Sequence, residues 1–250
     1  MTSIASTVSL SFLGLIAALL SLAMLMEMLP AYGRYLVFPF VVVGWLISLC
    51  LHEFGHAIVA YRSGDRSVLD KGYLTLDPLR YTDLQYSIVW PLIFLAVGSV
   101  GLPGDAVYLN KHAIRSPVDR SLVSAAGPLA NAAVLLLLLV ILPAVGTTIS
   151  APFYAGLAFL AFLQLTSLVL TLLPIPGLDG WGIIEPWLPG EFQEFGARAA
   201  GIAPTLLFAT FLLVPAVNGM FWRVVHDLAN RINLDVLSAG FGLQLFQFWR

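Results

Sequence analysis

Five apolar stretches, each long enough to cross a lipid bilayer as a helix, constrain the fold of this 250-residue chain. A helix needs about 20 consecutive apolar residues to span the hydrocarbon core, where its backbone polar groups must be paired internally. Composition agrees, because 59% of the residues are hydrophobic and only 10% are charged, too few to cover a soluble domain with polar surface. The sequence therefore predicts an all-α polytopic membrane protein. The stretches are residues 8–29, 36–61, 122–143, 152–187 and 199–217.

A further apolar segment, residues 84–102, is interrupted by Pro91, Gly98 and Gly101 and lies within the most basic part of the chain. By the positive-inside rule, that basic part faces the cytoplasm. A segment that re-enters the membrane keeps its flanking cations on one side, and its proline and glycines suit irregular backbone packed against protein. We therefore predict five to six transmembrane helices, with residues 84–102 as a re-entrant segment. Seven of the twelve cations lie in the basic part: Arg62, Arg66, Lys71, Arg80, Lys111, Arg115 and Arg120.

The chain is predicted to form one membrane-embedded domain over residues 1–250, with a core at about 36–190. Residues 1–35 add a first helix that is expected to be retained, because its long apolar run lacks a basic leader and a cleavage site. Residues 219–250, rich in Trp and Phe, are predicted to lie at the membrane interface. The lipid bilayer is thus an expected partner. Nucleic acid is not, because the net charge is −2 and no basic stripe is present.

The second apolar stretch contains the sequence His52-Glu53-Phe54-Gly55-His56. A charged group at membrane depth costs roughly 2.5–3.5 kcal/mol on insertion scales, so such groups need compensation. Residues four apart share one face of a helix, so His52 and His56 can reach the same metal ion. HExxH on a helix is the signature of zinc proteases, in which the Glu activates the metal-bound water. This motif assigns Glu53 as the catalytic base.

A third metal ligand is expected at the same depth, because a catalytic zinc takes three protein ligands and keeps one open position. His52 lies ten residues before Arg62, the expected cytoplasmic end of its helix, and so about 15 Å deep. Asp179 lies ten residues before Pro189 and reaches the same depth of about 15 Å. Asp179 is the only other ionisable residue within a predicted span at this level, which makes it the third ligand by elimination.

Two further segments approach the predicted site. Residues 172–180 contain two prolines and two glycines, which predicts an unwound patch with free carbonyls where an extended peptide could dock. A kinked helix with no further role is the alternative. Asn131 lies about 16 Å deep and is a candidate for contact with substrate or oxyanion. Gly127 and Pro128, just before it, also suit ordinary close packing between helices.

Three blocks of sequence, residues 52–56, 124–131 and 173–180, resemble in order and spacing the site-2 protease family of intramembrane zinc metalloproteases. Residues 72–110 resemble a compact prokaryotic branch that lacks PDZ and CBS domains. The resemblance covers about residues 36–190. It implies a multi-pass protein of a bacterial or archaeal cell membrane, with its active site towards the cytoplasmic side.

The same resemblance implies one zinc ion held by His52, His56 and Asp179, with Glu53 as general base. It implies substrates that are membrane proteins with a transmembrane helix, cut in regulated intramembrane proteolysis. Thr171 departs from the family pattern, which has Asn at this place. A Thr donates one hydrogen bond, whereas Asn offers two donors and an acceptor. The departure weakens the substrate or oxyanion contact expected from position 171. Asn131 and Gly127 are the other candidates for such contacts.

The predicted function is therefore an intramembrane zinc metalloendopeptidase. One alternative is a non-catalytic zinc-binding membrane protein that holds partner helices, which has no need of Glu53. A second alternative is a metal transporter. Transporters commonly have repeated halves with paired broken helices, whereas this sequence shows one broken helix.

Overall fold

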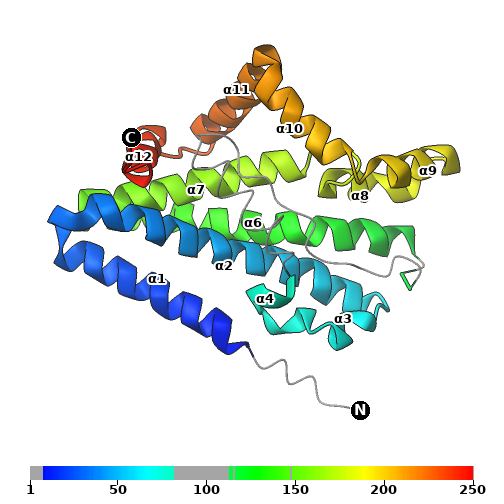
Figure 1. Cartoon of the computed structure of the whole chain (residues 1–250), viewed down its shortest axis with the longest axis horizontal. Coiled ribbons are helices and arrows are strands. Elements are labelled where there is room, and N and C mark those ends of the chain that lie inside the picture. Colours follow the sequence, from blue (N-terminus) through cyan, green and yellow to red (C-terminus); the bar gives the residue numbers. More distant parts are fainter. Residues whose placement is uncertain (1–7, 82–112, 115, 147, 250) are drawn as a thin grey trace.

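The computed structural model describes residues 8–81, 113–114, 116–146 and 148–249, and every regular element within these ranges is helical (Figure 1). The predicted all-α class is thus confirmed. Four of the described helices are long and apolar enough to cross a membrane, or five if one bent pair counts as a single span. The predicted re-entrant segment 84–102 lies outside the described residues. The four long helices are α1 (Leu10–Met28), α2 (Gly33–Arg62), α6 (Pro117–Val145) and α7 (Ala151–Thr171).

The centre of the molecule is a bundle of α2, α6 and α7, which pack against one another. Helix α6 runs antiparallel to α2 and α7, so the end of α2, the start of α6 and the end of α7 lie together (Figure 1). Gly55 allows the closest approach of α2 and α6, since a Cβ atom there would lie 2.6 Å from the carbonyl oxygen of Ala126. Small residues at helix interfaces permit such close packing in membranes. Helix α1 packs on the outside of α2.

The apolar stretch 152–187 is not one continuous helix. Helix α7 ends at Thr171, and a separate short helix, α8 (Asp179–Ile184), follows before the 3-10 turn η4 (Glu185–Trp187). Pro174 and Pro176 cannot continue a helix, and Gly177 adopts a positive φ of 91° that favours glycine. The predicted unwound patch is therefore present. The depth estimate for Asp179 used the wrong end point, because Asp179 begins α8 and does not lie within a helix that ends at Pro189.

The apolar stretch 199–217 is also divided and does not form one continuous helix. Helices α9 (Gly190–Ala199) and α10 (Ala203–Leu213) meet at an angle of 67°. Helix α11 (Pro215–Arg231) then begins at a proline, a residue that suits the first turn of a new helix. Helix α10 alone covers about 16 Å, which is roughly half of the hydrocarbon thickness.

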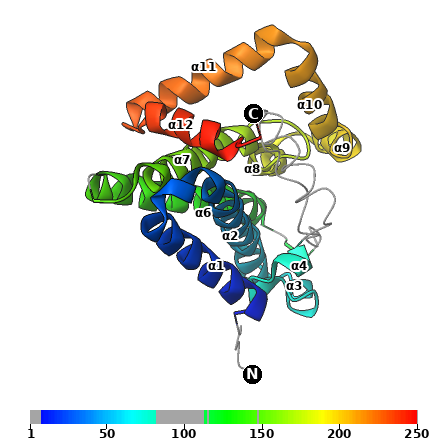
Figure 2. The same ribbon diagram turned by 60° about the vertical axis from the view of Figure 1, so that its left-hand side comes forward.

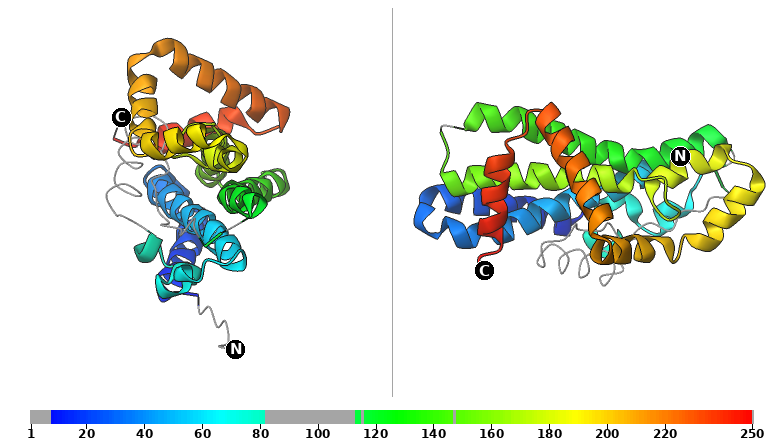
Figure 3. Two further views of the ribbon diagram at one scale, coloured as in Figure 1. Left: turned by 90° about the vertical axis from the view of Figure 1, so that its right-hand side faces the viewer. Right: turned by 90° about the horizontal axis from the view of Figure 1, so that it is seen from above.

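The C-terminal helices cover the face of the bundle opposite α1 (Figures 2 and 3). Helix α12 (Val236–Phe246) packs across α7 and α2, and its Phe246 is fully buried. Part of the predicted interfacial tail is therefore attached to the core, while its position relative to a membrane surface stays a prediction. The remaining described elements are short: η1 (Pro30–Tyr32), α3 (Ser67–Asp70), η2 (Tyr73–Thr75) and α4 (Pro78–Tyr81).

Candidate active site

Helix α2 supplies the two histidines and the glutamate of the HExxH motif. His52, Glu53 and His56 are all buried, with 4%, 4% and 8% of their surfaces exposed. The Nε2 atoms of His52 and His56 lie 3.0 Å apart. The helical spacing predicted from the sequence therefore brings the two imidazoles to a common point inside the bundle.

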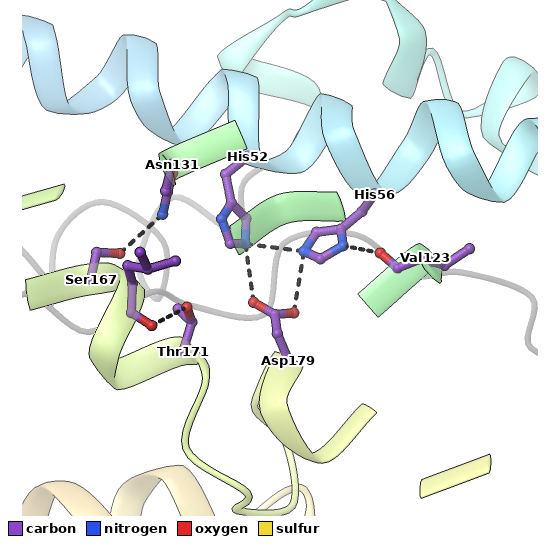
Figure 4. Close-up of polar contacts among 8 residues, drawn as sticks. His52, His56, Val123, Asn131, Ser167, Thr171 and Asp179 are labelled. Carbon is purple, nitrogen blue, oxygen red and sulfur yellow. Dashed lines mark hydrogen bonds and ion pairs between the residues drawn. The ribbon is translucent and has the colours of Figure 1, made fainter. Parts of the chain in front are cut away.

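Asp179 completes this cluster from the first turn of α8. Its Oδ2 lies 3.3 Å from His52 Nε2, and its Oδ1 lies 3.2 Å from His56 Nε2 (Figure 4). Bonds of about 2.0–2.2 Å to a tetrahedral zinc place ligand atoms roughly 3.3–3.6 Å apart. The three donor groups therefore have nearly the spacing of a zinc site, and within the described residues they form the one group of this kind.

Gly127 of α6 keeps the space beside these nitrogen atoms open. A Cβ atom at Gly127 would lie 2.5 Å from His52 Nε2 and would also press against His56 Nε2. Any side chain at this position would thus occupy the place where a metal ion and its water would sit. The residues suit a zinc ion for two reasons: two imidazoles and a carboxylate can act as its ligands, and Gly127 leaves space beside them.

The two histidines differ in how their second ring nitrogen is held. His56 Nδ1 lies 2.7 Å from the carbonyl oxygen of Val123, in the first part of α6. An Nδ1–H that donates to this carbonyl leaves the Nε2 lone pair directed towards a metal. His52 Nδ1 is buried and has no hydrogen-bond partner among the residues that the structure describes.

A hydrogen-bonded link attaches the segment that carries Asp179 to α6. The Ser121 hydroxyl donates to the carbonyl oxygen of Ile183, at 2.6 Å, and accepts a hydrogen bond from Trp187 Nε1, at 2.8 Å. Nothing local in the sequence indicates that Ser121 would hold α8 and η4 in place.

The predicted substrate contacts lie near the cluster but use their polar groups elsewhere. Asn131 is buried, and its Nδ2 donates to Ser167 Oγ at 3.2 Å. Thr171 is buried at the end of α7, where its hydroxyl lies 3.4 Å from the carbonyl oxygen of Leu168 in the same helix. Figure 4 shows both residues on the His52 side of the cluster. Their contacts with a substrate, and that of Gly127, stay predictions.

A second polar group, which sequence reasoning missed, lies behind His52. Gln164 of α7 is almost fully buried and donates from Nε2 to Ser48 Oγ, at 3.0 Å, on the neighbouring α2. Ser48 in turn donates to the carbonyl oxygen of Gly44. The sequence could have indicated this pair, because Ser48 and Gln164 are polar residues within otherwise apolar stretches, where polar side chains need partners.

Comparison with known proteins identifies the family. Residues 40–149 match peptidase family M50. Over 213 residues, 85% of this chain and 82% of the relative, the sequence is 48% identical to a protein named "putative zinc metalloprotease Rip2" from Mycobacterium tuberculosis. The chain belongs to peptidase family M50, the site-2 proteases. Identity to the Rip2 protein of Mycolicibacterium smegmatis is 45%, again with 85% and 82% coverage.

The M50 assignment extends to a more distant relative. The YwhC protein of Bacillus subtilis, which bears the same zinc metalloprotease description, is 30% identical over 81% of this chain and 93% of its own length. No solved structure matches the chain. This M50 chain is therefore a zinc metalloprotease and an integral membrane protein, which favours the enzyme over the non-catalytic and transporter alternatives.

Proposed function

We propose that this metalloprotease hydrolyses peptide bonds in or near the transmembrane segments of other membrane proteins. One observation carries the proposal: His52, His56 and Asp179 converge on one buried point between helices long enough to cross a membrane. A substrate that reaches this point must do so from within or beside the bilayer. The resulting reaction class is regulated intramembrane proteolysis.

The residues divide the chemistry between them. His52, His56 and Asp179 would hold one zinc ion, which lowers the pKa of a bound water towards about 7 and polarises the scissile carbonyl. Glu53 accepts a proton from the attacking water as the water oxygen bonds to the carbonyl carbon. Glu53 then returns that proton to the amine nitrogen as the carbon–nitrogen bond breaks. Gly127 leaves room beside His52 and His56 for the reacting groups.

A helical substrate must unwind locally before cleavage, because a helix hides its carbonyl groups in internal hydrogen bonds. The connection between α7 and α8, residues 172–178, supports docking of such an extended segment. Pro174 and Pro176 lack N–H groups, so this connection pairs fewer of its own carbonyls than a helix would. We retain Asn131 and Thr171 as proposed contacts along this path.

The proposed orientation places the site towards the cytoplasmic side of a bacterial membrane. Seven of the twelve lysines and arginines lie between Arg62 and Arg120, and cytoplasmic loops carry such an excess. The end of α2 and the start of α6, which flank this basic segment, lie at the same end of the bundle (Figure 1). Water and released product would then exchange with the cytoplasm.

The decisive experiment compares membrane proteomes of cells that carry the wild type or Glu53→Ala. We expect single-span membrane proteins to accumulate uncut in the Glu53→Ala cells, while the purified variant still contains zinc. The exposed Glu194→Ala variant provides a matched loss of one carboxylate and should behave as wild type, since Glu194 pairs with Arg198 on the exposed surface of α9. Cleavage of a reconstituted single-span substrate by Glu53→Ala at the wild-type rate would overturn the proposal.

A further inference from the structure

A small cavity lined by both polar and apolar side chains lies between α2, α6 and α7, on the side of His52 that faces away from His56. It has a volume of about 20 Å³, which is enough for one water molecule. Figure 4 shows Asn131 and Ser167 on this side of the His52 ring. The residues that line the cavity are Trp45, Ser48, Leu49, His52, Asn131, Gln164 and Ser167.

His52 brings an unsatisfied donor to this cavity. Its Nε2 faces His56 and Asp179, so a metal-binding His52 must carry its proton on Nδ1. That Nδ1 is buried and unpartnered among the described residues. A buried unpaired N–H costs about 1–3 kcal/mol, and histidine ligands almost always donate this proton to an outer partner. His56 has such a partner in the Val123 carbonyl, whereas the described part of the chain provides none for His52.

The cavity supplies the acceptors that a bridging water needs. Gln164 donates from Nε2 to Ser48, which fixes the amide and leaves its Oε1 as an acceptor. Asn131 donates from Nδ2 to Ser167, which likewise leaves its Oδ1 as an acceptor. A buried water makes about three hydrogen bonds. It can accept one from His52 Nδ1–H and donate its two protons to the amide oxygens.

We propose that this cavity binds one water molecule that accepts the Nδ1 proton of His52, and that Gln164 and Ser48 are positioning residues for this zinc ligand. The water and its amide partners would fix the tautomer and ring orientation of His52, as Val123 does for His56. The inference rests on the proposed zinc site. It also gives Asn131 a role separate from its predicted contact with substrate.

The test measures zinc affinity by competition with a fluorescent chelator, on purified full-length protein in detergent. The variants are Gln164→Leu, which removes the acceptor at nearly constant volume, and Ser48→Ala, which removes the hydroxyl that orients Gln164. The control is Thr166→Val, two residues further along α7. It removes a buried hydroxyl that donates to the carbonyl oxygen of Phe162 in its own helix.

We expect Gln164→Leu to weaken zinc binding by about 10-fold or more, as losses of outer-shell partners typically do. Ser48→Ala should weaken it by a smaller factor, and Thr166→Val should leave it unchanged. Thermal unfolding of the metal-free proteins should be the same for Gln164→Leu and Thr166→Val, which separates the effect on the ligand from a general loss of stability.

Wild-type zinc affinity in Gln164→Leu, or an equal loss in Thr166→Val, would overturn the inference. Ser48→Ala keeps the test decisive if Gln164→Leu does not fold, since wild-type affinity in Ser48→Ala would then refute it. Absence of zinc from the wild-type protein is a different result, which would refute the proposed function itself.

Discussion

His56 Nδ1 lies 2.7 Å from the carbonyl oxygen of Val123, so a backbone group of α6 holds a side chain of α2 that we propose as a metal ligand. The contact joins two helices that approach closely at Gly55 and Gly127. Because the acceptor belongs to the backbone, the orientation of His56 depends on the packing of α2 against α6 and not on the identity of the side chain at position 123. Substitutions that separate the two helices should therefore impair the metal site.

Gly127→Ala tests this dependence directly. The added Cβ would lie 2.5 Å from His52 Nε2, so the imidazoles must move apart or the helices must separate. We expect zinc affinity to fall by at least about 10-fold and cleavage to be lost. Gly14→Ala on α1 is the matched control, because a Cβ there meets no atom within 4 Å. Normal zinc content in Gly127→Ala would show that the space beside the histidines is not needed.

Asp179→Asn should keep the shape of the side chain but remove the negative charge that faces both imidazoles. The Asp179 oxygens lie 3.2 and 3.3 Å from the two Nε2 atoms, and carboxylates are the oxygen ligands that zinc prefers. We expect the zinc content of the purified protein, measured by mass spectrometry, to fall well below one ion per chain. The surface variant Asp227→Asn, which loses a pair with Arg231, should retain the metal.

Removal of zinc should lower thermal stability as well as activity. A ligand that binds only the folded state stabilises it by about 2.7 kcal/mol at 100 times its dissociation constant. Treatment with a chelator should therefore stop cleavage and lower the unfolding midpoint, and added zinc should restore both. In His52→Ala, zinc should no longer shift the midpoint. A wild-type midpoint that ignores zinc would count against a metal site in the folded protein.

Ser121→Ala should loosen the segment that carries Asp179. The variant loses the hydrogen bonds to Ile183 and from Trp187, each worth about 0.5–1.5 kcal/mol. We expect the free energy of unfolding to fall by about 1–3 kcal/mol, with a weaker zinc affinity. Ser21→Ala on α1 is the control, because the Ser21 hydroxyl donates to the carbonyl oxygen of Ala17 in its own helix. Equal effects of the two substitutions would contradict the proposed link.

The free energy of unfolding should depend on pH through Asp235, which lies outside the membrane-spanning helices. Partial burial alone would raise the pKa of Asp235, but hydrogen bonds from the backbone N–H and hydroxyl of Ser238 outweigh it, and the pKa is lowered. A lowered folded-state pKa stabilises the fold above the ordinary carboxyl pKa of about 3.9, and this contribution is lost as the pH falls below that value.

Asp235→Ala should lower the free energy of unfolding by about 0.5–2 kcal/mol at neutral pH, because Asp235 caps the start of α12. The difference from wild type should shrink when unfolding is measured below pH about 4. Asp235→Asn retains a capping oxygen without a titrating charge, so its stability should vary less with pH. A constant difference between wild type and Asp235→Ala across this range would refute the electrostatic part of the prediction.

Local patterns in the sequence were enough to predict much of the fold. The α1, α2, α6 and α7 spans follow from apolar runs, and the shared face of His52 and His56 follows from helical spacing. The break near Asp179 was predictable because Pro174 and Pro176 cannot donate backbone hydrogen bonds. Asp179 lies beside His52 although it does not belong to the helix assumed in the depth estimate, because the unwound connection returns the chain to His52 (Figure 4).

Three features could be predicted without a structure: an all-helical membrane protein, two histidines on one helix face, and a carboxylate available to join them. These features depend on hydropathy and on residues one helical turn apart. The surroundings of the histidines, in contrast, follow from helix packing: the open space at Gly127, the Val123 carbonyl behind His56, and Gln164 behind His52. These contacts depend on how closely α2, α6 and α7 approach and in which register, and no local pattern specifies either.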